Sequence, residues 1–487
     1  MADWKYEAEK TLDPVDEAGW GELRALGHRM LDGIFDHVQG VRQGPVWREM
    51  PVESRLRLES EGIPRTGQGA SAAYESFVSD VLPYGIGNVH PRFWGWVMGS
   101  GTPIGMLAEM LAAGMNPNVG GFNDSAMMVE EQVIRWMAEL MGMPEGTSGL
   151  LTSGGSMANL IGLAVGRHAR AGFDVRGEGL PSGPLLRVYG STETHSWLKK
   201  ALELMGMGRV SLCSVGVDED YRMKIGEVKE AIAADRAAGI GPLCVVGTAG
   251  TVNTGATDDL SAIADLCATE GLWFHIDGAF GALAYWSEKL RPALAGMERA
   301  DSLAFDLHKW GYLPYDVGCV LVRDAEAYRA AFATGASYLN AMERGPVAGG
   351  IRFAERTPEL SRGFRALKVW MSFKAQGVDS ITELVEQNVE QARYLAARIT
   401  RDPELELAAD VPLNIVCFRY RGASDAENQE ILQRLQERGI AVPSSTVLEG
   451  RFAMRVANTN HRSRREDFDL LADAVIEIGR EVVGERR

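Results

Sequence analysis

Between residues 150 and 325, short apolar runs alternate with helix-like stretches, and this alternation restricts the fold more than any other feature. The runs at 149–152, 185–189, 243–248, 272–276, 302–305 and 317–322 predict strands. Helical stretches, such as residues 258–270, separate several of them. The pattern is typical of a mostly parallel sheet covered on both faces, and we therefore expect an α/β fold.

The chain of 487 residues is too long for one hydrophobic core, so we expect two or three domains. Residues 1–85 are helix-like and charged, and we interpret them as an N-terminal arm that needs a surface to lie against. Residues 86–375 form the expected large domain, with helices over 127–141 and 364–375. Residues 376–487 form a smaller α+β domain, with a helix over 381–400 and strands near 414–420 and 451–457.

Charge and composition exclude several classes of protein. A net charge of −16 disfavours nucleic-acid binding, which needs a basic surface. No apolar run approaches the roughly 20 residues of a membrane span, and the first residues lack the pattern of a secretory signal. Five cysteines stand singly in apolar segments, as is usual in a reducing compartment. They are Cys213, Cys244, Cys267, Cys319 and Cys417. We therefore expect a cytoplasmic protein that acts on a small molecule.

Lys309, in the segment DLHKW at 306–310, and Asp277, in FHIDGA at 274–279, each follow a predicted strand. A lysine can carry a carbonyl cofactor as a Schiff base, and pyridoxal phosphate also needs an acid that keeps its ring nitrogen protonated. Taken singly, each residue has an ordinary interpretation, because an Asp after a strand forms turns and a lone Lys is solvated. Together the two residues favour a pyridoxal-phosphate enzyme.

Three further segments supply candidate ligands. SGGSMAN at 153–159 opens a helix, where Gly155 lets the backbone approach an anion and Ser156 offers a hydroxyl, although it also suits a plain N-cap turn. Thr248 ends a strand at the edge where open α/β sheets bind ligands. His195, in THSW, follows another strand by a short loop. Its imidazole can stack on a planar cofactor or be an ordinary loop histidine.

A metal site is the alternative chemistry for these residues. It would use His195, His275, His308 and Asp277, but no HxxxH or HxH spacing supports it, so we predict no bound metal. Four of the candidate segments directly follow predicted strands, and this coincidence favours one cofactor site.

The motifs resemble those of the group II pyridoxal-phosphate amino-acid decarboxylases, and the aromatic-L-amino-acid decarboxylases in particular. The resemblance runs from about residue 90 to residue 457. It rests, in order, on HPRF (90–93), TSGGS (152–156), THS (194–196), TAGT (248–251), HIDGA (275–279), HKW (308–310) and RGFRALK (362–368). It implies that Lys309 forms the internal aldimine with pyridoxal phosphate, that Asp277 pairs with the pyridinium nitrogen and that His195 stacks on the ring.

By the same resemblance, Gly155, Ser156 and His308 hold the phosphate, Ala279 packs under the ring and Thr248 lies near the substrate carboxylate. The implied fold is PLP fold type I, as in aspartate aminotransferase. It has an N-terminal arm, a large, mostly parallel sheet domain and a small C-terminal α+β domain. Members of the family are homodimers with active sites at the subunit interface, so we expect a homodimer without nucleic-acid or membrane partners.

Two positions depart from the pattern of the family. Many relatives carry Asn where this chain has Asp306, and an acid beside a phosphate is unfavourable unless it is otherwise paired. In many relatives a loop tyrosine protonates the substrate carbon after CO₂ leaves, but no tyrosine lies between residues 340 and 361. Counting back from Phe364 places Phe353 near that position. In some relatives a phenylalanine there accompanies oxidative deamination.

We therefore expect removal of the α-carboxylate of an L-amino acid, which gives the amine and CO₂. Phe93, Trp94 and Trp96 lie near the segment that contacts the substrate in the family, and they favour an aromatic side chain, although they suit a core equally. One alternative is decarboxylation with oxidative deamination, which gives an aldehyde, CO₂, ammonia and hydrogen peroxide. Another is a non-catalytic protein that binds pyridoxal phosphate.

Overall fold

The computed structural model describes residues 10–334, 343–348 and 352–485, and a seven-stranded sheet lies at its centre. The strand order is β2-β8-β7-β6-β5-β3-β4, and β8 runs antiparallel to both of its neighbours while the other pairs are parallel. The strands are β2 (Ser148–Thr152), β3 (Leu186–Ser191), β4 (Leu212–Val215), β5 (Gly241–Thr248), β6 (Trp273–Asp277), β7 (Ser302–Asp306) and β8 (Gly318–Val322). The predicted mostly parallel sheet and its six predicted strands are confirmed.

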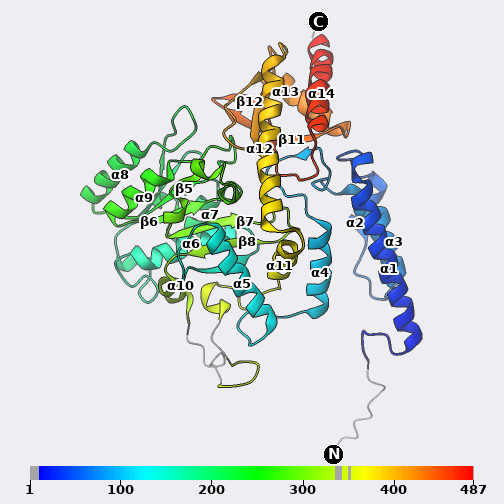
Figure 1. Ribbon diagram of the computed structural model, residues 1–487, viewed down its shortest axis with the longest axis horizontal. Helices are drawn as coiled ribbons and strands as arrows, with labels where there is room; N and C mark the ends of the chain where they lie inside the picture. Colours follow the sequence, from blue (N-terminus) through cyan, green and yellow to red (C-terminus); the bar gives the residue numbers. More distant parts are fainter. Residues whose placement is uncertain (1–9, 335–342, 349–351, 486–487) are drawn as a thin grey trace, which may run out of the picture.

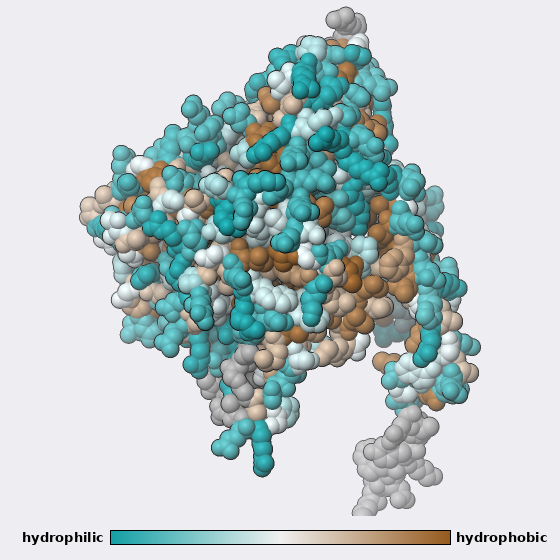
Figure 2. Space-filling view, viewed as in Figure 1, coloured by the Kyte–Doolittle hydropathy of each residue, from teal (hydrophilic) through white to brown (hydrophobic). Residues whose placement is uncertain are grey.

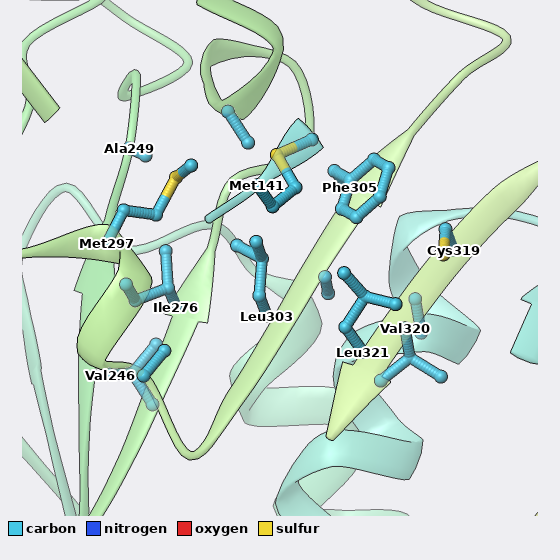
Figure 3. Packing of buried hydrophobic residues seen from close by; sticks show 14 of the residues in the cluster. Met141, Val246, Ala249, Ile276, Met297, Leu303, Phe305, Cys319, Val320 and Leu321 are labelled. Carbon is cyan, nitrogen blue, oxygen red and sulfur yellow. The ribbon is translucent and has the colours of Figure 1, made fainter. Parts of the chain in front are cut away.

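Helices that contact this sheet or one another enclose a large apolar core (Figure 1). They are α4 (Pro103–Met115), α5 (Ser125–Leu140), α6 (Gly155–Arg170), α7 (Trp197–Leu204), α8 (Ile225–Ala237), α9 (Leu260–Glu270), α10 (Ala325–Phe332), α11 (Ala366–Gln376) and α12 (Val378–Arg401). Helix α6 packs across β2 and β5 to β8. Figure 3 shows Val246, Ile276 and Leu303, from three neighbouring strands, together in this core, and all three are fully buried.

A second, five-stranded sheet forms a smaller unit with the C-terminal helices, at the top of Figure 1. Its order is β1-β11-β12-β10-β9, and β1 is parallel to β11. The elements are β1 (Phe93–Trp94), β9 (Leu405–Leu407), β10 (Ile415–Tyr420), β11 (Val442–Leu448), β12 (Arg451–Ala457), α13 (Asp425–Glu437) and α14 (Arg465–Gly484). Because β1 comes from the segment assigned to the large domain, the chain crosses between the two units. The domain limits at 85/86 and 375/376 stay predictions.

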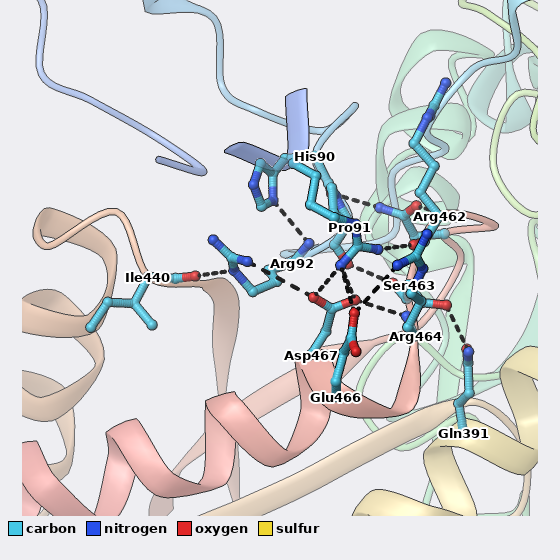
Figure 4. A network of polar contacts seen from close by, with 12 residues as sticks. His90, Pro91, Arg92, Gln391, Ile440, Arg462, Ser463, Arg464, Glu466 and Asp467 are labelled. Carbon is cyan, nitrogen blue, oxygen red and sulfur yellow. Dashed lines mark hydrogen bonds and ion pairs between the residues drawn. The ribbon is translucent and has the colours of Figure 1, made fainter. Parts of the chain in front are cut away.

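The N-terminal arm consists of α1 (Glu17–Gly40), α2 (Val52–Ser60) and α3 (Ala70–Asp80), which lie to one side, beyond α4 (Figure 1). No residue of α1 is buried. The arm is tied to the small unit where α1 ends, because the Arg42 guanidinium donates to both Asp467 carboxylate oxygens, at 2.9 and 3.1 Å. Asp467 also accepts from the Arg464 backbone at the start of α14, within the polar network of Figure 4.

Short 3-10 helices fill several connections. They are η1 (Val41–Gln43), η2 (Leu82–Tyr84), η3 (Leu180–Ser182), η4 (Arg209–Ser211), η5 (Gly281–Trp286), η6 (Arg291–Leu294), η7 (Met297–Arg299) and η9 (Phe353–Arg356). In the described part of the chain, no helix combines the length and the apolar character that crossing a membrane requires.

A buried ion pair fixes the strand that leads into the candidate anion loop. The side chains of Glu130 on α5 and Arg362 are both fully inaccessible, and their charged atoms lie 2.5 Å apart. Arg362 also donates to the carbonyls of Val119 and Leu151, while Glu130 accepts from the Leu151 backbone. The pair therefore holds α5 and β2 together, directly before the SGGS segment.

Replacement of Arg362 tests this ion pair. Arg362→Met should destabilise the protein by about 3–5 kcal/mol, because it leaves the Glu130 carboxylate buried without a cation. The measurement is the midpoint of denaturant unfolding. As a control, Arg329→Met removes an exposed pair with Glu355 and should change the midpoint little. Equal effects of the two substitutions would contradict a special role for the buried pair.

Candidate active site

The carboxyl ends of the parallel strands meet at one pocket of about 230 Å³. In the register, Thr248 on β5 lies opposite Asp277 on β6, and Asp277 lies opposite Ala304 on β7. The turn after β7 then brings Lys309 to the same edge. Thr248, Asp277 and Lys309 all line the pocket, so residues far apart in the sequence come together here.

Asp277 is held by two hydrogen bonds. It is 3% exposed, and its Oδ2 accepts from the Trp197 indole Nε1 at 2.6 Å, while its Oδ1 accepts from the Ala279 backbone at 3.1 Å. These bonds fix the orientation of the carboxylate at the base of the pocket and stabilise its charge. Trp197, at the start of α7, is a partner that the sequence analysis did not identify, because only the tertiary fold brings α7 beside β6.

Lys309 and Asp306 form a close ion pair. The Lys309 Nζ lies 2.8 Å from Oδ2 of Asp306, which is 1% exposed at the end of β7. Burial on its own lowers the pKa of Lys309, but the charge and hydrogen bond of Asp306, with a contribution from Asp277, outweigh it and raise that pKa. Without a cofactor, the lysine is therefore an ammonium that the carboxylate holds in place.

His195 lines the pocket with a neutral ring. Burial lowers the pKa of His195, and the charges of Lys309 and Lys200 add to this effect, against the opposing charge of Asp277. Its Nδ1 accepts from the Trp197 backbone at 3.3 Å, which orients the imidazole. A neutral, oriented ring at this position can stack on a planar ligand.

The candidate anion-binding residues lie at the start of α6. Gly155 and Ser156 are its first two residues and line the pocket, where the first N–H groups of a helix lack partners within the helix. Ala279 also lines the pocket. His308 does not line it. The His308 Nε2 lies 3.8 Å from the Asp306 carboxylate, and the ring packs on Tyr315.

Phe353 lies elsewhere. It is fully buried in η9, and the guanidinium carbons of Arg356 and Arg362 lie 5.2 and 5.1 Å from its ring centroid. It does not line the pocket. Its assignment to the protonating position therefore stays a prediction, and part of the surrounding loop, residues 335–342 and 349–351, falls outside the described residues.

Further residues of the pocket carry no recognisable motif. Trp96, Phe280 and Glu193 line it, and Glu193 accepts from the Asn253 side chain at 2.9 Å. Behind this wall, the buried Arg455 donates to the Trp96 carbonyl at 2.7 Å. No sequence signal marks Glu193 or Arg455, because their positions depend on how the small sheet packs against the large one.

His275 on β6 connects α6 to β7. Its Nε2 lies 2.7 Å from the Asn159 side-chain oxygen on α6, and its Nδ1 lies 2.8 Å from the Ser302 hydroxyl on β7. Burial lowers the pKa of His275 to about 3, so the ring is neutral. Within the described residues, no cluster of three or more His, Cys, Asp or Glu side chains could hold a metal ion.

Comparison with known proteins gives consistent matches. The pyridoxal-dependent decarboxylase conserved domain matches residues 71–421. An aromatic-L-amino-acid decarboxylase of Bacillus atrophaeus is 34% identical, over 92% of this chain and 93% of its own. An L-2,4-diaminobutyrate decarboxylase of Rhizobium meliloti is 30% identical, over 86% and 84%. The crystal structure of Oryza sativa TDC with PLP and tryptamine has a TM-score of 0.88 and 25% identity, over 97% and 99%.

The buried His275 predicts a pH dependence of stability. On unfolding, its pKa returns from about 3 to about 6.5, so between these values the unfolded chain binds a proton that the folded chain does not. Stability should therefore fall with falling pH, by up to about 1.4 kcal/mol per pH unit from this group. The measurement is the unfolding midpoint between neutral and mildly acidic pH. His275→Gln should give a shallower dependence, and an unchanged slope would contradict this account.

Proposed function

Because this chain belongs to the pyridoxal-dependent decarboxylase family, we propose that it removes the α-carboxylate of an aromatic L-amino acid and that Lys309 carries its cofactor. The chain is a pyridoxal-phosphate-dependent amino-acid decarboxylase with PLP fold type I, so the predicted family, cofactor, fold class and reaction class are confirmed. The roles of individual residues, the substrate and the assembly are our proposals.

The residues of the pocket fit pyridoxal phosphate. A fixed, buried carboxylate at Asp277 suits a cationic ring nitrogen, and the start of α6 suits a phosphate. The Thr248 hydroxyl is buried and has no hydrogen-bond partner among the described residues, although it lines the pocket. A bound ligand would give this hydroxyl a hydrogen-bond partner, because a buried polar group without a partner destabilises the fold.

We assign three catalytic roles. When bound, pyridoxal phosphate supplies an electron sink for the bonding pair that CO₂ leaves behind. Asp277, held by Trp197, keeps the proton on the ring nitrogen. The neutral ring of His195 fixes the plane of the cofactor, which orients the bond that breaks. Lys309 would hold the cofactor covalently in the pocket that Asp277 also lines.

The remaining proposed contacts follow the layout of the pocket. Gly155 and Ser156 bind the phosphate through the first turn of α6, and Ala279 packs under the ring. His308 supports the phosphate end from outside the lining, through its neighbour Asp306, whose carboxylate lies 3.8 Å from its Nε2. Thr248 faces the substrate, near the carboxylate that is lost.

The lining of the pocket supports an aromatic substrate. Trp96 and Phe280 offer flat apolar surfaces, and Lys309 is the one Lys or Arg among the described lining residues. With that lysine assigned to the cofactor, no cation remains to receive an acidic substrate side chain, and the Glu193 carboxylate repels one. The similarity to an aromatic-L-amino-acid decarboxylase points the same way.

We also propose a homodimer in the cytoplasm. Apolar side chains are exposed on the arm, including Trp20 (50%) and Leu56 (54%), and on α4, including Met110 (54%) and Leu111 (50%). Figure 2 shows apolar surface over α4, beside the arm. A thin arm with no buried residue in α1 gains stability by packing on a second copy of the chain. All five cysteines are unpaired, which suits a reducing compartment.

A panel of amino acids tests the substrate proposal. The enzyme should release CO₂ and amine fastest from an aromatic L-amino acid, more slowly from L-2,4-diaminobutyrate and slowest from L-glutamate. Glu193→Gln removes the negative charge of a pocket carboxylate but keeps the shape of the side chain, so it should retain the aromatic preference and relax the rejection of glutamate. Initial rates at equal substrate concentrations give the ranking. Fastest turnover of glutamate or diaminobutyrate would refute an aromatic substrate.

A second candidate reaction is oxidative deamination, which the tyrosine-free stretch from residue 340 to residue 361 favours. In this reaction the amino acid, O₂ and water give the aldehyde, CO₂, ammonia and hydrogen peroxide. Without a tyrosine as proton donor, the carbon that CO₂ leaves is exposed to O₂ for longer. Phe353 is the residue of this stretch that we assign to the protonating position. Its side chain is buried and does not line the pocket of its own chain.

Product analysis in air separates the two reactions. Simple decarboxylation should give amine and CO₂ in equal amounts without peroxide. Under the second candidate, aldehyde and peroxide accumulate, and Phe353→Tyr shifts the products toward the amine. The paired measurement is amine, aldehyde, CO₂ and peroxide from one reaction, for both proteins. If the wild-type enzyme makes peroxide but Phe353→Tyr leaves the ratio unchanged, Phe353 does not occupy the protonating position.

A further inference from the structure

Asp306, the residue that departs from the family's pattern, occupies a space built for a carboxylate. It ends β7, is 1% exposed, and has one oxygen 2.8 Å from the Lys309 amine. A Cβ at Gly155 would lie 2.8 Å from one of its oxygens, and a Cβ at Gly318 would lie 2.7 Å from the other. Glycines from two different elements therefore make room for this side chain.

The burial of Asp306 requires a cation beside it. An ionised carboxylate away from water is costly unless a positive charge compensates it. The Asp306 Oδ1 has no hydrogen-bond partner among the described residues. His308 is the other basic neighbour, at 3.8 Å, but burial lowers the pKa of His308, so its ring is neutral. The compensating charge therefore comes from Lys309 in its ammonium form.

We propose that Asp306 is a positioning residue that keeps Lys309 protonated whenever the lysine is free, so that cofactor loading requires loss of this proton. After the ammonium gives its proton to solvent, the amine attacks the aldehyde carbon of the cofactor, a C=N bond forms and water leaves. Because only the neutral amine is a nucleophile, loading becomes faster as pH rises. The inference rests on the proposed role of Lys309 as the cofactor lysine.

Other ionisable groups also act on this pair. Asp277 on β6 and Tyr315 act on Lys309, and Asp306 also acts on His195 before α7, on His308, on Tyr315 and on Cys319 of β8. Farther away, Asp316 and Lys368 act on His308, Lys200 acts on His195 and Glu130 acts on Cys319. Among them, Asp277 is the second carboxylate that favours the ammonium, but Trp197 already binds it. Asp306 is the carboxylate in direct contact with the amine, so its replacement should have the largest effect.

Asp306→Asn tests the inference, because the amide keeps the shape and removes the charge. The experiment uses the full-length protein stripped of cofactor and follows the Schiff-base absorbance after addition of pyridoxal, which lacks the phosphate. The wild-type rate should still rise above about pH 9. In Asp306→Asn the pH midpoint should fall by about one unit or more, which makes the reaction about tenfold faster at neutral pH.

Asp316→Asn is the matched control, because Asp316 is a nearby acid that pairs with Arg365 and not with Lys309. It should keep the wild-type midpoint. An unchanged midpoint in Asp306→Asn overturns the inference. So does an acceleration with pyridoxal phosphate that is absent with pyridoxal, since the carboxylate would then act on the phosphate alone.

Two measurements keep the inference testable if Asp306→Asn does not fold. A wild-type rate that already reaches its plateau at neutral pH overturns it without any variant, because the amine would then be neutral. Lys309→Ala should incorporate no pyridoxal at the pocket. If Lys309→Ala reacts as fast as the wild type, the proposed cofactor lysine is wrong, and this outcome is distinct from a failure of the role of Asp306.

Discussion

The pairing register of β5, β6 and β7, which places the carboxyl ends of these strands side by side, is the constraint on which the rest of the site depends. Thr248 lies opposite Asp277, and Asp277 lies opposite Ala304, so the segments that follow these strands leave the sheet at one edge. Side chains alternate along a strand, so a slip of one residue in β6 would turn Asp277 away from the pocket and take Ile276 out of its place in the core. The fully buried Ile276, packed among its neighbours in the core, opposes such a slip.

Two buried carboxylates at the ends of β6 and β7 have separate partners. Asp277 accepts from the Trp197 indole, while Asp306 pairs with Lys309. The Asp277 carboxylate is thus held in place by groups of this chain alone, and such preorganisation reduces the reorganisation that catalysis requires.

The sequence predicts those parts of the fold and of the site that follow from apolar periodicity and from motifs at the ends of strands. The six predicted strands of the large sheet, and the edge at which Lys309, Asp277 and Thr248 meet, follow from apolar runs and their flanking residues. It does not reveal contacts that depend on packing between distant elements, such as Trp197 on Asp277. Short strands such as β1 and β4 also carry too few residues for a pattern. The burial of Phe353 in η9 is likewise not visible in a count along the loop, and its assignment to the protonating position stays a prediction.

The central claim is that Lys309 carries the cofactor over Asp277. Borohydride reduction of the enzyme loaded with pyridoxal phosphate, followed by peptide mapping, tests it most directly, because reduction makes the bond to the lysine permanent. The account predicts one modified peptide, which contains the segment DLHKW at 306–310. Stoichiometric labelling of any other lysine would contradict the proposed site.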